Sequence, residues 1–358
     1  MRIVQLLPGI SYGDAVSNDA LAIRRIIQEM GYDTGVYSQT IGSRITPDMA
    51  LPLEKMGRLK EEDILLYHGA LGTYLNRTVP SYPCTKVMRY HNITPPAFFY
   101  TYSNDYVDAT EAGYEDMRYL SDKLDYCIAD SGYNREQLLE MGYGCPVSVC
   151  PILIPLEDYR KKPDRQILER YGKDGTTNLL FVGRVAPNKK QEDIIRAFYV
   201  YRKYYNPDSR LFLVGSCDIG RYGTRLRDYV DALGLDGKVI FTGHVRFDEI
   251  LAYYRVADAF VCMSEHEGFC VPVVEAMTFH VPVVAYRSCA VPETLGQGGI
   301  LLEDKDPYTA AAAIHRVTSD RALRRKSILC QKRELQRFAY ETVKKRLEGI
   351  LREIMAKR

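Results

Sequence analysis

Several motifs that would assign a function directly are missing from this sequence. No G-x-G-x-x-G follows a predicted strand, so the dinucleotide-binding fingerprint is absent. The nine cysteines include no Cys-x-x-Cys pair, which removes the usual spacing of a structural zinc site. No apolar run is long enough to form a membrane-spanning helix. No low-complexity tract interrupts the chain, so a globular protein is expected.

The cysteines are odd in number, scattered, and in several cases placed inside apolar runs. Cys262 lies in AFVCM and Cys127 lies in DYCIAD. Buried, reduced thiols of a cytoplasmic protein are the simplest explanation. The initial stretch MRIVQLLPG is too short an apolar run for a signal peptide and predicts a first strand. We therefore expect a cytoplasmic location.

Length and charge indicate two unlike halves. A chain of 358 residues exceeds what one core usually supports, so two domains are expected. Residues 1–155 carry 13 Lys and Arg against 19 Asp and Glu, whereas residues 156–358 carry 35 against 27. The basic second half suits a phosphate-bearing ligand, with plain surface lysines as the alternative. The acidic first half does not indicate a peripheral membrane contact, although a lipid-linked acceptor stays open.

Short apolar runs alternate with helix-length amphipathic segments, a pattern typical of parallel sheets with crossover helices. We therefore expect an α/β fold of two facing Rossmann-like, doubly wound domains with a cleft between them. The charged stretch LEDYRKKPD, within Pro155–Asp164, has no clear period and marks the boundary. The expected domains are 1–158 and 159–337, and residues 338–358 are predicted to form a helix that packs back on the first domain.

The secondary-structure expectation is specific enough to be tested. Ser17 is predicted to cap a helix that runs to Met30, and Ser131 to cap a helix that ends near Gly142. The predicted strands are Arg2–Leu7, Thr34–Ser38, Asp63–His68, Lys86–His91, Asp125–Ala129, Val147–Ile154, Asn178–Val182, Arg210–Val214, Lys238–Phe241, Ala259–Met263 and Pro282–Tyr286.

The most informative segment is EGFCVPVVEAM, which begins at Glu267. Pro272 suits the first position of a helix, so Glu275 falls at the end of the first turn. The backbone N–H groups of Gly268–Val271 would be unpaired and would attract phosphate. The segment thus offers a carboxylate beside a reacting centre, a phosphate cradle and a second carboxylate for a sugar diol. An ordinary loop-to-helix junction with a first-turn Glu is the alternative.

A second informative segment, a basic loop, follows the predicted strand NLLFV. In GRVAPNKK, Arg184 and Lys189 flank a turn at Pro187-Asn188 that leads into a helix. The two cations can neutralise a diphosphate without a metal. The string lacks the second glycine and the Ser/Thr of a Walker loop. A basic helix start opposes the helix dipole, which favours a functional role over a structural one.

Further candidates stand at other strand ends. Gly13, in LPGISYGDAVSND, allows close backbone approach to a ligand, with a plain turn glycine as the alternative. His68 and His91 can hydrogen-bond a substrate hydroxyl or stabilise positive charge, and a structural role is the alternative, more so for His68. The backbone of His244 and Val245, in FTGHVRFDE, can contact a nucleotide base. The one Asp-x-Asp, Asp304–Asp306, precedes a helix as a cap would, so no metal or other cofactor is expected.

Taken together, the motifs of the second half resemble those of retaining glycosyltransferases of family 4, the glycosyl transferases group 1, which have the GT-B fold. The matching strings are VGRVAPNKK, FTGHV, SEHEGFCVPVVEAM, VPVVAY and AVPETLGQGGILLED, in the order of that family. YGDAVSND and YHNITPP in the first half resemble the family more loosely.

The resemblance implies roles for the donor-binding residues. Arg184 and Lys189 would bind the donor diphosphate, and Glu275 would accept hydrogen bonds from the ribose. Glu267 would lie beside the transferred sugar. Backbone contacts to sugar and phosphate would come from Gly268, Phe269 and Cys270.

In the first half, the same resemblance implies that Gly13 places N–H groups near the phosphates and that His91 lies near the acceptor and the sugar. The family usually has Gly-Gly in this loop, and this chain has Gly13-Asp14, which puts the acceptor-side geometry in doubt. Glu267, His91, Arg184 and Lys189 form the expected catalytic set.

The expected activity is the retaining, metal-independent transfer of a hexose from a UDP- or GDP-linked donor to an acceptor hydroxyl, in glycan, polysaccharide or glycoconjugate biosynthesis. The expected partners are the nucleotide-sugar donor and a sugar, glycan or lipid-linked acceptor, and no nucleic acid. A nucleotide-sugar 2-epimerase or an inactive donor-binding subunit are the alternatives. The order of the motifs favours transfer over the first, and the intact Arg184, Lys189, Glu267 and Glu275 argue against the second.

Overall fold

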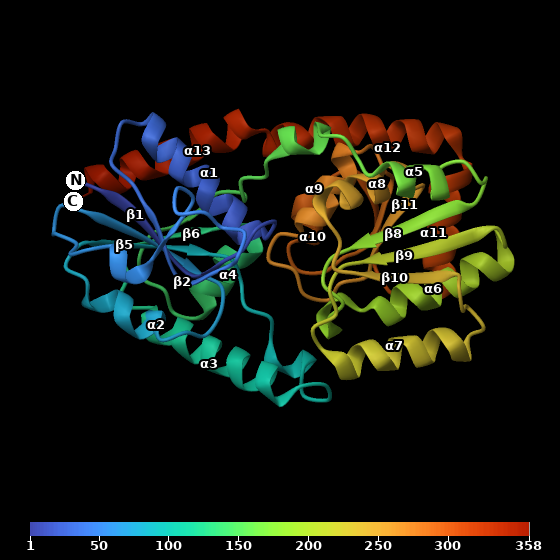
Figure 1. The fold of residues 1–358 in the computed structure, drawn as a ribbon, viewed down its shortest axis with the longest axis horizontal. Helices are drawn as coiled ribbons and strands as arrows, with labels where there is room; N and C mark the ends of the chain where they lie inside the picture. Colours follow the sequence, from blue (N-terminus) through green and yellow to red (C-terminus); the bar gives the residue numbers. More distant parts are fainter. Residues whose placement is uncertain (358) are drawn as a thin grey trace. The chain divides into compact units, whose positions relative to one another are not determined.

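The computed structural model describes residues 1–357 and divides the chain into two compact units, drawn in Figure 1. The N-terminal unit contains Met1–Ala97, Asn104–Pro155 and the residues from Phe338 onward; the C-terminal unit contains Phe98–Ser103 and Leu156–Arg337. The chain therefore passes between the units four times. The domain predicted over residues 1–158 includes Phe98–Ser103, whereas in the structure this segment belongs to the C-terminal unit.

The N-terminal unit is built on one seven-stranded sheet with the strand order β3-β2-β1-β4-β5-β6-β7, and every pair in it is parallel. Its strands are β1 (Ile3–Ile10), β2 (Val36–Ile41), β3 (Leu51–Pro52), β4 (Ile64–Gly69), β5 (Thr85–Tyr90), β6 (Tyr126–Ala129) and β7 (Val147–Val149).

Helices cover both faces of this sheet, as buried parallel sheets require. On one face, α1 (Ala15–Glu29) and the final helix α13 (Tyr340–Ala356) share a core cluster that includes Ile23, Ile27, Leu347 and Leu351. The other face carries α2 (Leu75–Thr78), α3 (Asn104–Leu120) and α4 (Gly132–Glu140) over a second cluster (Figure 1).

The C-terminal unit has a six-stranded sheet with the order β10-β9-β8-β11-β12-β13, again all parallel. The strands are β8 (Thr177–Val182), β9 (Ser209–Val214), β10 (Val239–Gly243), β11 (Ala259–Cys262), β12 (Val283–Tyr286) and β13 (Gly299–Leu302). The helices are α5 (Arg165–Tyr171), α6 (Gln191–Tyr204), α7 (Gly220–Ala232), α8 (Phe247–Val256), α9 (Val271–Thr278), α10 (Val291–Leu295), α11 (Pro307–Ser319) and α12 (Arg321–Glu334).

Short 3-10 helices connect several of these elements. They are η1 (Leu53–Lys55), η2 (Val79–Ser81), η3 (Pro96–Phe98), η4 (Leu156–Arg160), η5 (Pro187–Lys189) and η6 (Leu335–Phe338). Among residues 1–357, no helix combines the length and the apolar character needed to cross a lipid bilayer.

Each sheet has one point where the strand order reverses: between β1 and β4 in the N-terminal unit, and between β8 and β11 in the C-terminal unit. Ligands of open α/β sheets bind outside the carboxyl ends of the strands at such a switch point. The loops after β8 and β11 carry two of the motifs singled out above, GRVAPNKK and EGFCVPVVEAM.

The predicted α/β class of two doubly wound units is confirmed, and each predicted strand overlaps an observed one. Two details were wrong. The strand predicted over Val147–Ile154 ends at Val149, shortly before Pro151, which has no N–H to give to a ladder. The N-cap of α1 is Asp14 rather than Ser17, since the Asp14 carboxylate accepts a hydrogen bond from the Ser17 N–H at 3.0 Å. The helices α2, α3, α5, α10 and α12 and the strands β3 and β13 were not predicted.

Candidate functional site

Three adjacent strands of the C-terminal unit are followed by, or end in, glycines with positive φ: Gly183 after β8, Gly215 after β9 and Gly243 in β10. The Gly215 N–H donates to the Gly243 carbonyl at 3.2 Å. A Cβ on Gly215 would lie 2.0 Å from the Gly183 carbonyl oxygen, so no side chain fits at this position. Close backbone packing thus determines where the loop beginning at Arg184 leaves the sheet.

Asn188 joins the loop after β8 to the loop after β11. The Asn188 carbonyl accepts a hydrogen bond from the Glu265 N–H at 2.9 Å, and its side-chain amide donates to the His266 carbonyl at 3.1 Å. Asn188 is 4% exposed, so these bonds are made away from competing water. The sequence marked this residue only as part of a turn, because its partners lie almost eighty positions further along the chain.

The same two loops bring together two of the predicted site residues. The Lys189 Nζ lies 2.8 Å from the Glu267 Oε2, and the two side chains are 18% and 11% exposed. An ammonium and a carboxylate at a switch point give one group for an anionic ligand and one acceptor for hydroxyls. Arg184 is exposed, and its backbone carbonyl accepts a hydrogen bond from the Gln191 side chain at 3.0 Å.

The segment Gly268–Cys270 is held from the side by the start of α10. The Ala290 N–H donates to the Glu267 carbonyl at 3.2 Å, and the Thr294 hydroxyl donates to the Phe269 carbonyl. Cys270 is the N-cap of α9 and has a left-handed backbone with φ of 72°. Since α9 begins at Val271, Pro272 occupies the second helical position, not the first as predicted. The change is small, because the N–H that proline lacks would be unpaired at either position.

Glu275 is held by two tyrosines that the sequence analysis missed. The Tyr159 hydroxyl donates to Oε1 at 2.6 Å, and the Tyr254 hydroxyl donates to Oε2 at 2.7 Å. Burial raises the pKa of Glu275, and the two hydrogen bonds oppose this effect only in part. Tyr159 belongs to η4 and Tyr254 to α8, so no local pattern around Glu275 points to either.

A second ionic cluster lies beside the first. Lys190 contacts Glu265 at 3.2 Å, and Lys305 contacts both Glu265 and Asp193, the latter at 2.8 Å. Burial works against ionisation of Glu265, but the two lysines outweigh it and lower its pKa. The loop that contains Glu267 is therefore braced by charges on the residues before it.

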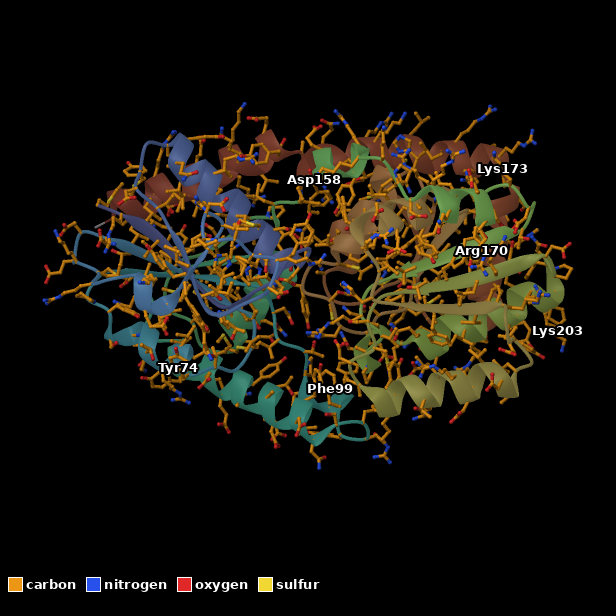
Figure 2. The ribbon with its side chains drawn as sticks, viewed as in Figure 1. Tyr74, Phe99, Asp158, Arg170, Lys173 and Lys203 are labelled. Carbon is orange, nitrogen blue, oxygen red and sulfur yellow. The ribbon has the colours of Figure 1, made fainter. Side chains whose placement is uncertain are left out.

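The segment Phe98–Ser103 also lies on the C-terminal unit. The Phe98 ring is 6.2 Å from that of His266, and the Lys190 Nζ is 5.7 Å from the Phe98 ring. Arg225 of α7 donates to the Tyr102 hydroxyl at 2.7 Å. Figure 2 labels the buried Phe99 in this segment, beside the start of α7.

His244 and Val245 follow β10 at the edge of the sheet. His244 is exposed and Val245 is half-buried. In the strand order β10-β9-β8-β11, the strands β9 and β8 lie between β10 and the switch point. His244 and Val245 are therefore on the β8 side of that point, two strands away from it.

In the N-terminal unit, Gly13 has φ of 83°, and Asp14 caps α1 by accepting from both the N–H and the hydroxyl of Ser17. This explains the Asp in place of a second glycine. The five residues before Asp14, Gly9–Gly13, have the sequence G-x-S-x-G, which is the motif of a nucleophile elbow. Ser11 does not have the positive φ that strain at such a turn would produce, and its N–H donates to the Ser17 hydroxyl at 2.9 Å, so this string does not define a nucleophile.

His91 lies in a buried chain of polar side chains. Its Nε2 is 2.8 Å from the His68 Nδ1, and its Nδ1 is 2.8 Å from the Asp130 carboxylate. The other nitrogen of His68 is 3.0 Å from the Gln5 Oε1. Burial, His91 and Arg89 lower the pKa of His68 well below its usual value, so His68 is neutral. His68, which the sequence analysis ranked as the weaker candidate, is thus a direct neighbour of His91.

The hydrogen bonds locate the protons in this chain. The Gln5 amide N–H donates to the Ala20 carbonyl, so its oxygen faces His68 and His68 must donate from Nε2. Neutral His68 then accepts at Nδ1, and His91 must donate to it. Because His91 also faces a carboxylate, both of its nitrogens carry protons, or the proton is shared with Asp130.

Charge balance agrees with this assignment. Arg89 contacts Asp19 at 2.9 Å and Asp130 at 3.1 Å, and all three side chains are at most 2% exposed. Two carboxylates and one guanidinium leave one negative charge, which a ring N–H of His91 directed at Asp130 would stabilise. The ligand atoms of Asp19, His68 and His91 lie within 4.8 Å of one another, but these hydrogen bonds already occupy them, so the group does not form a metal site.

With this geometry described, the protein can be compared with known ones. The two parallel sheets and their covering helices are those of the GT-B fold. A sucrose-phosphate synthase from Thermosynechococcus elongatus superposes with a TM-score of 0.76 over the whole of both chains at 17% identity. HepE from Anabaena, solved in complex with UDP-glucose, superposes with a TM-score of 0.77, also at 17% identity, over 99% of this chain and 100% of that chain. At this identity the likeness establishes the fold alone.

The family-model match lies in the C-terminal unit. Residues 163–330 match the model of the glycosyl transferases group 1, which confirms the resemblance seen in the motifs. A GDP-mannose-dependent alpha-(1-6)-phosphatidylinositol monomannoside mannosyltransferase of Mycolicibacterium smegmatis is 27% identical over 57% of this chain and 56% of its own length. A D-inositol 3-phosphate glycosyltransferase of Thermobifida fusca is 30% identical over 56% and 48%. The chain thus matches about half the length of these curated relatives.

Proposed function

We propose that this protein is a glycosyltransferase that moves a hexose from a nucleotide-diphosphate sugar to an acceptor hydroxyl. The observation that carries the proposal is the ion pair of Lys189 and Glu267 at the β8–β11 switch point, inside the region that matches the glycosyl transferases group 1. The ammonium suits the diphosphate, and the carboxylate suits hydroxyls of the attached sugar.

The chemistry of the leaving group fits the two loops. Transfer builds positive charge on the sugar and negative charge on the departing phosphate. Lys189, Arg184 and the N–H groups at the start of α9 would stabilise the leaving diphosphate, because preorganised donors in a water-poor site act most strongly where charge develops. No metal is needed in this scheme, and the acceptor proton would pass to the leaving phosphate. Retention of the anomeric configuration is part of the proposal.

The proteins that this chain is similar to include ones with uridine and ones with guanosine donors, so both remain candidates. Among the relatives, the mannosyltransferase is named for GDP-mannose, and the Anabaena structure contains UDP-glucose. Glu275, oriented by Tyr159 and Tyr254, is suited to accept from ribose hydroxyls, which both nucleotides share. A sugar, glycan or lipid-linked acceptor would be bound by the N-terminal unit.

The first experiment is a thermal-shift panel of UDP-, GDP- and dTDP-sugars, since a bound donor raises the melting temperature. The donor that binds is then incubated with and without candidate acceptors while released nucleotide is measured. Acceptor-dependent release supports the proposal, and the anomeric configuration of the product and the rate in EDTA test retention and metal independence. Conversion of the donor without an acceptor would indicate an epimerase, and binding without turnover would indicate an inactive donor-binding subunit.

A further inference from the structure

Two thiols lie beside the Glu267 carboxylate. Cys262 is the last residue of β11, and Cys270 is the N-cap of α9. The sulfur atoms of Cys262 and Cys270 and a carboxylate oxygen of Glu267 all lie within 4.8 Å of one another. The two cysteines are 1% and 5% exposed and the Glu267 side chain is 11% exposed, so the group meets solvent mainly at Glu267.

Cys270 belongs to this group while its backbone has an unfavourable conformation. Its left-handed conformation, with φ of 72° and ψ of 63°, is uncommon for a residue other than glycine. Its Cβ is therefore carried by a strained turn between Phe269 and α9.

Two thiolates and a carboxylate are a ligand set for a borderline-soft divalent cation. Zinc binds sulfur at about 2.3 Å in a tetrahedral geometry, so two sulfurs on one ion are about 3.8 Å apart. Atoms already within 4.8 Å of one another need only small movements to reach this geometry. In contrast, a disulfide would require the two sulfurs to approach to about 2.05 Å.

We propose that Cys262, Glu267 and Cys270 bind one divalent cation of the Zn²⁺ class, with water in the fourth position. On binding, each thiol loses its proton to solvent and forms a sulfur–metal bond, and no electron is transferred. The cation replaces the Lys189 ammonium as the counter-charge of Glu267. Resting on the proposed function, this site is inhibitory, because a Glu267 that holds a cation is not available to the donor sugar.

The rest of the chain provides a matched control. Cys127 and Cys145 form another thiol pair, with their sulfurs 3.6 Å apart. Within residues 1–357 this pair is not part of any close group of three ligands. The variant Cys145→Ala therefore removes a thiol pair without touching the proposed site.

The test is a titration of the full chain with Co²⁺, which gives a thiolate charge-transfer absorption and the visible bands of a tetrahedral ion. We expect one equivalent to bind and to be displaced by Zn²⁺, with proton release measured in weak buffer. The signal should be lost in Cys262→Ser and in Cys270→Ser, and Glu267→Gln should weaken binding at least about tenfold. Cys145→Ala should bind as the wild type does. Glu267→Gln keeps the size of the side chain, so this variant remains informative if a cysteine variant fails to fold.

Absence of the charge-transfer band in the wild type, its survival in Cys262→Ser, or its loss in Cys145→Ala would overturn the proposal. These measurements use neither donor nor acceptor, so they fail or succeed independently of the transferase activity. If transfer is observed, the ratio of rates with and without Zn²⁺ is compared between the wild type and Cys262→Ser, with a chelator to reverse the effect. Inhibition that persists unchanged in Cys262→Ser would show that Zn²⁺ acts elsewhere.

Discussion

Lys189 and Glu267 are far apart in the sequence, and their charged atoms lie 2.8 Å apart. They do not belong to the same helix or strand: Lys189 is the last residue of η5, and Glu267 lies in the loop after β11. The pair exists because β8 and β11 are neighbours in the sheet and because Asn188 holds their loops together.

Replacement of Lys189 by Met should reduce kcat/KM by about 10²–10³, the usual effect of removing one group that stabilises developing charge. Glu267→Gln should also reduce it. The double variant should lose less than the product of the two single losses, because the side chains are in contact. Steady-state kinetics with the donor found in the thermal-shift panel measures all three.

Lys190 provides the control for this prediction. It is the next residue along the chain and carries the same charge, but it pairs with Glu265 instead. Lys190→Met should therefore reduce kcat/KM much less than Lys189→Met does. Equal losses in the two variants would mean that the general charge of the loop matters and the pair does not.

Glu275→Gln should stabilise the protein at neutral pH while weakening donor binding. Burial raises the pKa of Glu275 above 4.5, so the folded state binds its proton more tightly than the unfolded state does. The contribution of Glu275 to the free energy of unfolding is thus greatest below pH 4.5 and is lost as pH rises through the folded pKa. The melting temperature of Glu275→Gln should therefore exceed that of the wild type at neutral pH.

Below pH 4.5, where Glu275 is protonated in both states, this difference should disappear. Tyr254→Phe is the matched control, because it keeps the carboxylate and removes one of its two donors; it should lower the melting temperature. A Glu275→Gln variant that is less stable than the wild type at neutral pH would contradict the prediction.

Asn188→Ala should loosen both site loops. The substitution removes the hydrogen bond from the Asn188 amide to the His266 carbonyl, which contributes about 0.5–1.5 kcal/mol. It should also raise KM for the donor, since the loops that carry Lys189 and Glu267 are then joined by the backbone bond from Glu265 to Asn188 without the side-chain bond. Urea unfolding and donor titration measure the two effects. Asn206→Ala, which removes a side-chain bond to Thr177 at 2.8 Å on a different loop, should leave donor KM unchanged.

His68 should make stability depend on pH in the mildly acidic range. Its folded pKa is lowered well below 6.5, mainly by burial, so below pH 6.5 only the unfolded state takes up its proton. The stabilising contribution is complete above pH 6.5 and decreases as pH falls, by up to about 1.4 kcal/mol per pH unit. Chemical unfolding at several pH values should show this slope in the wild type and a smaller slope in His68→Gln. Identical slopes would mean that His68 is not held neutral.

The hydrogen-bond assignment of His91 can be observed directly. With six histidines in the chain, long-range ¹H–¹⁵N spectra can be assigned by single substitutions. His91 should carry a proton on Nε2, where it donates to His68, and His68 should give the nitrogen shifts of a neutral ring protonated at Nε2. A neutral His91 in which Nε2 carries no proton would disprove the proton arrangement.

The sequence by itself determined the class of fold and the two loops of the site. Apolar periodicity is a local property, so the strands and most helices could be predicted without knowing what they pack against. Lys189 and Glu267 could be found because each belongs to a short string whose residue types suit phosphate and sugar. α3 was missed because its apolar stripe is weak: charged residues lie between Tyr114, Met117 and Leu120.

Tertiary structure alone decided which distant residues meet. Tyr159 and Tyr254 orient Glu275, Cys262 approaches Cys270, and Phe98–Ser103 lies on the C-terminal unit, although nothing near these residues in the sequence indicates their partners. The physical reason is that such contacts depend on strand order and on where each crossover returns to the sheet. Those are properties of the whole packed core, and no local pattern encodes them.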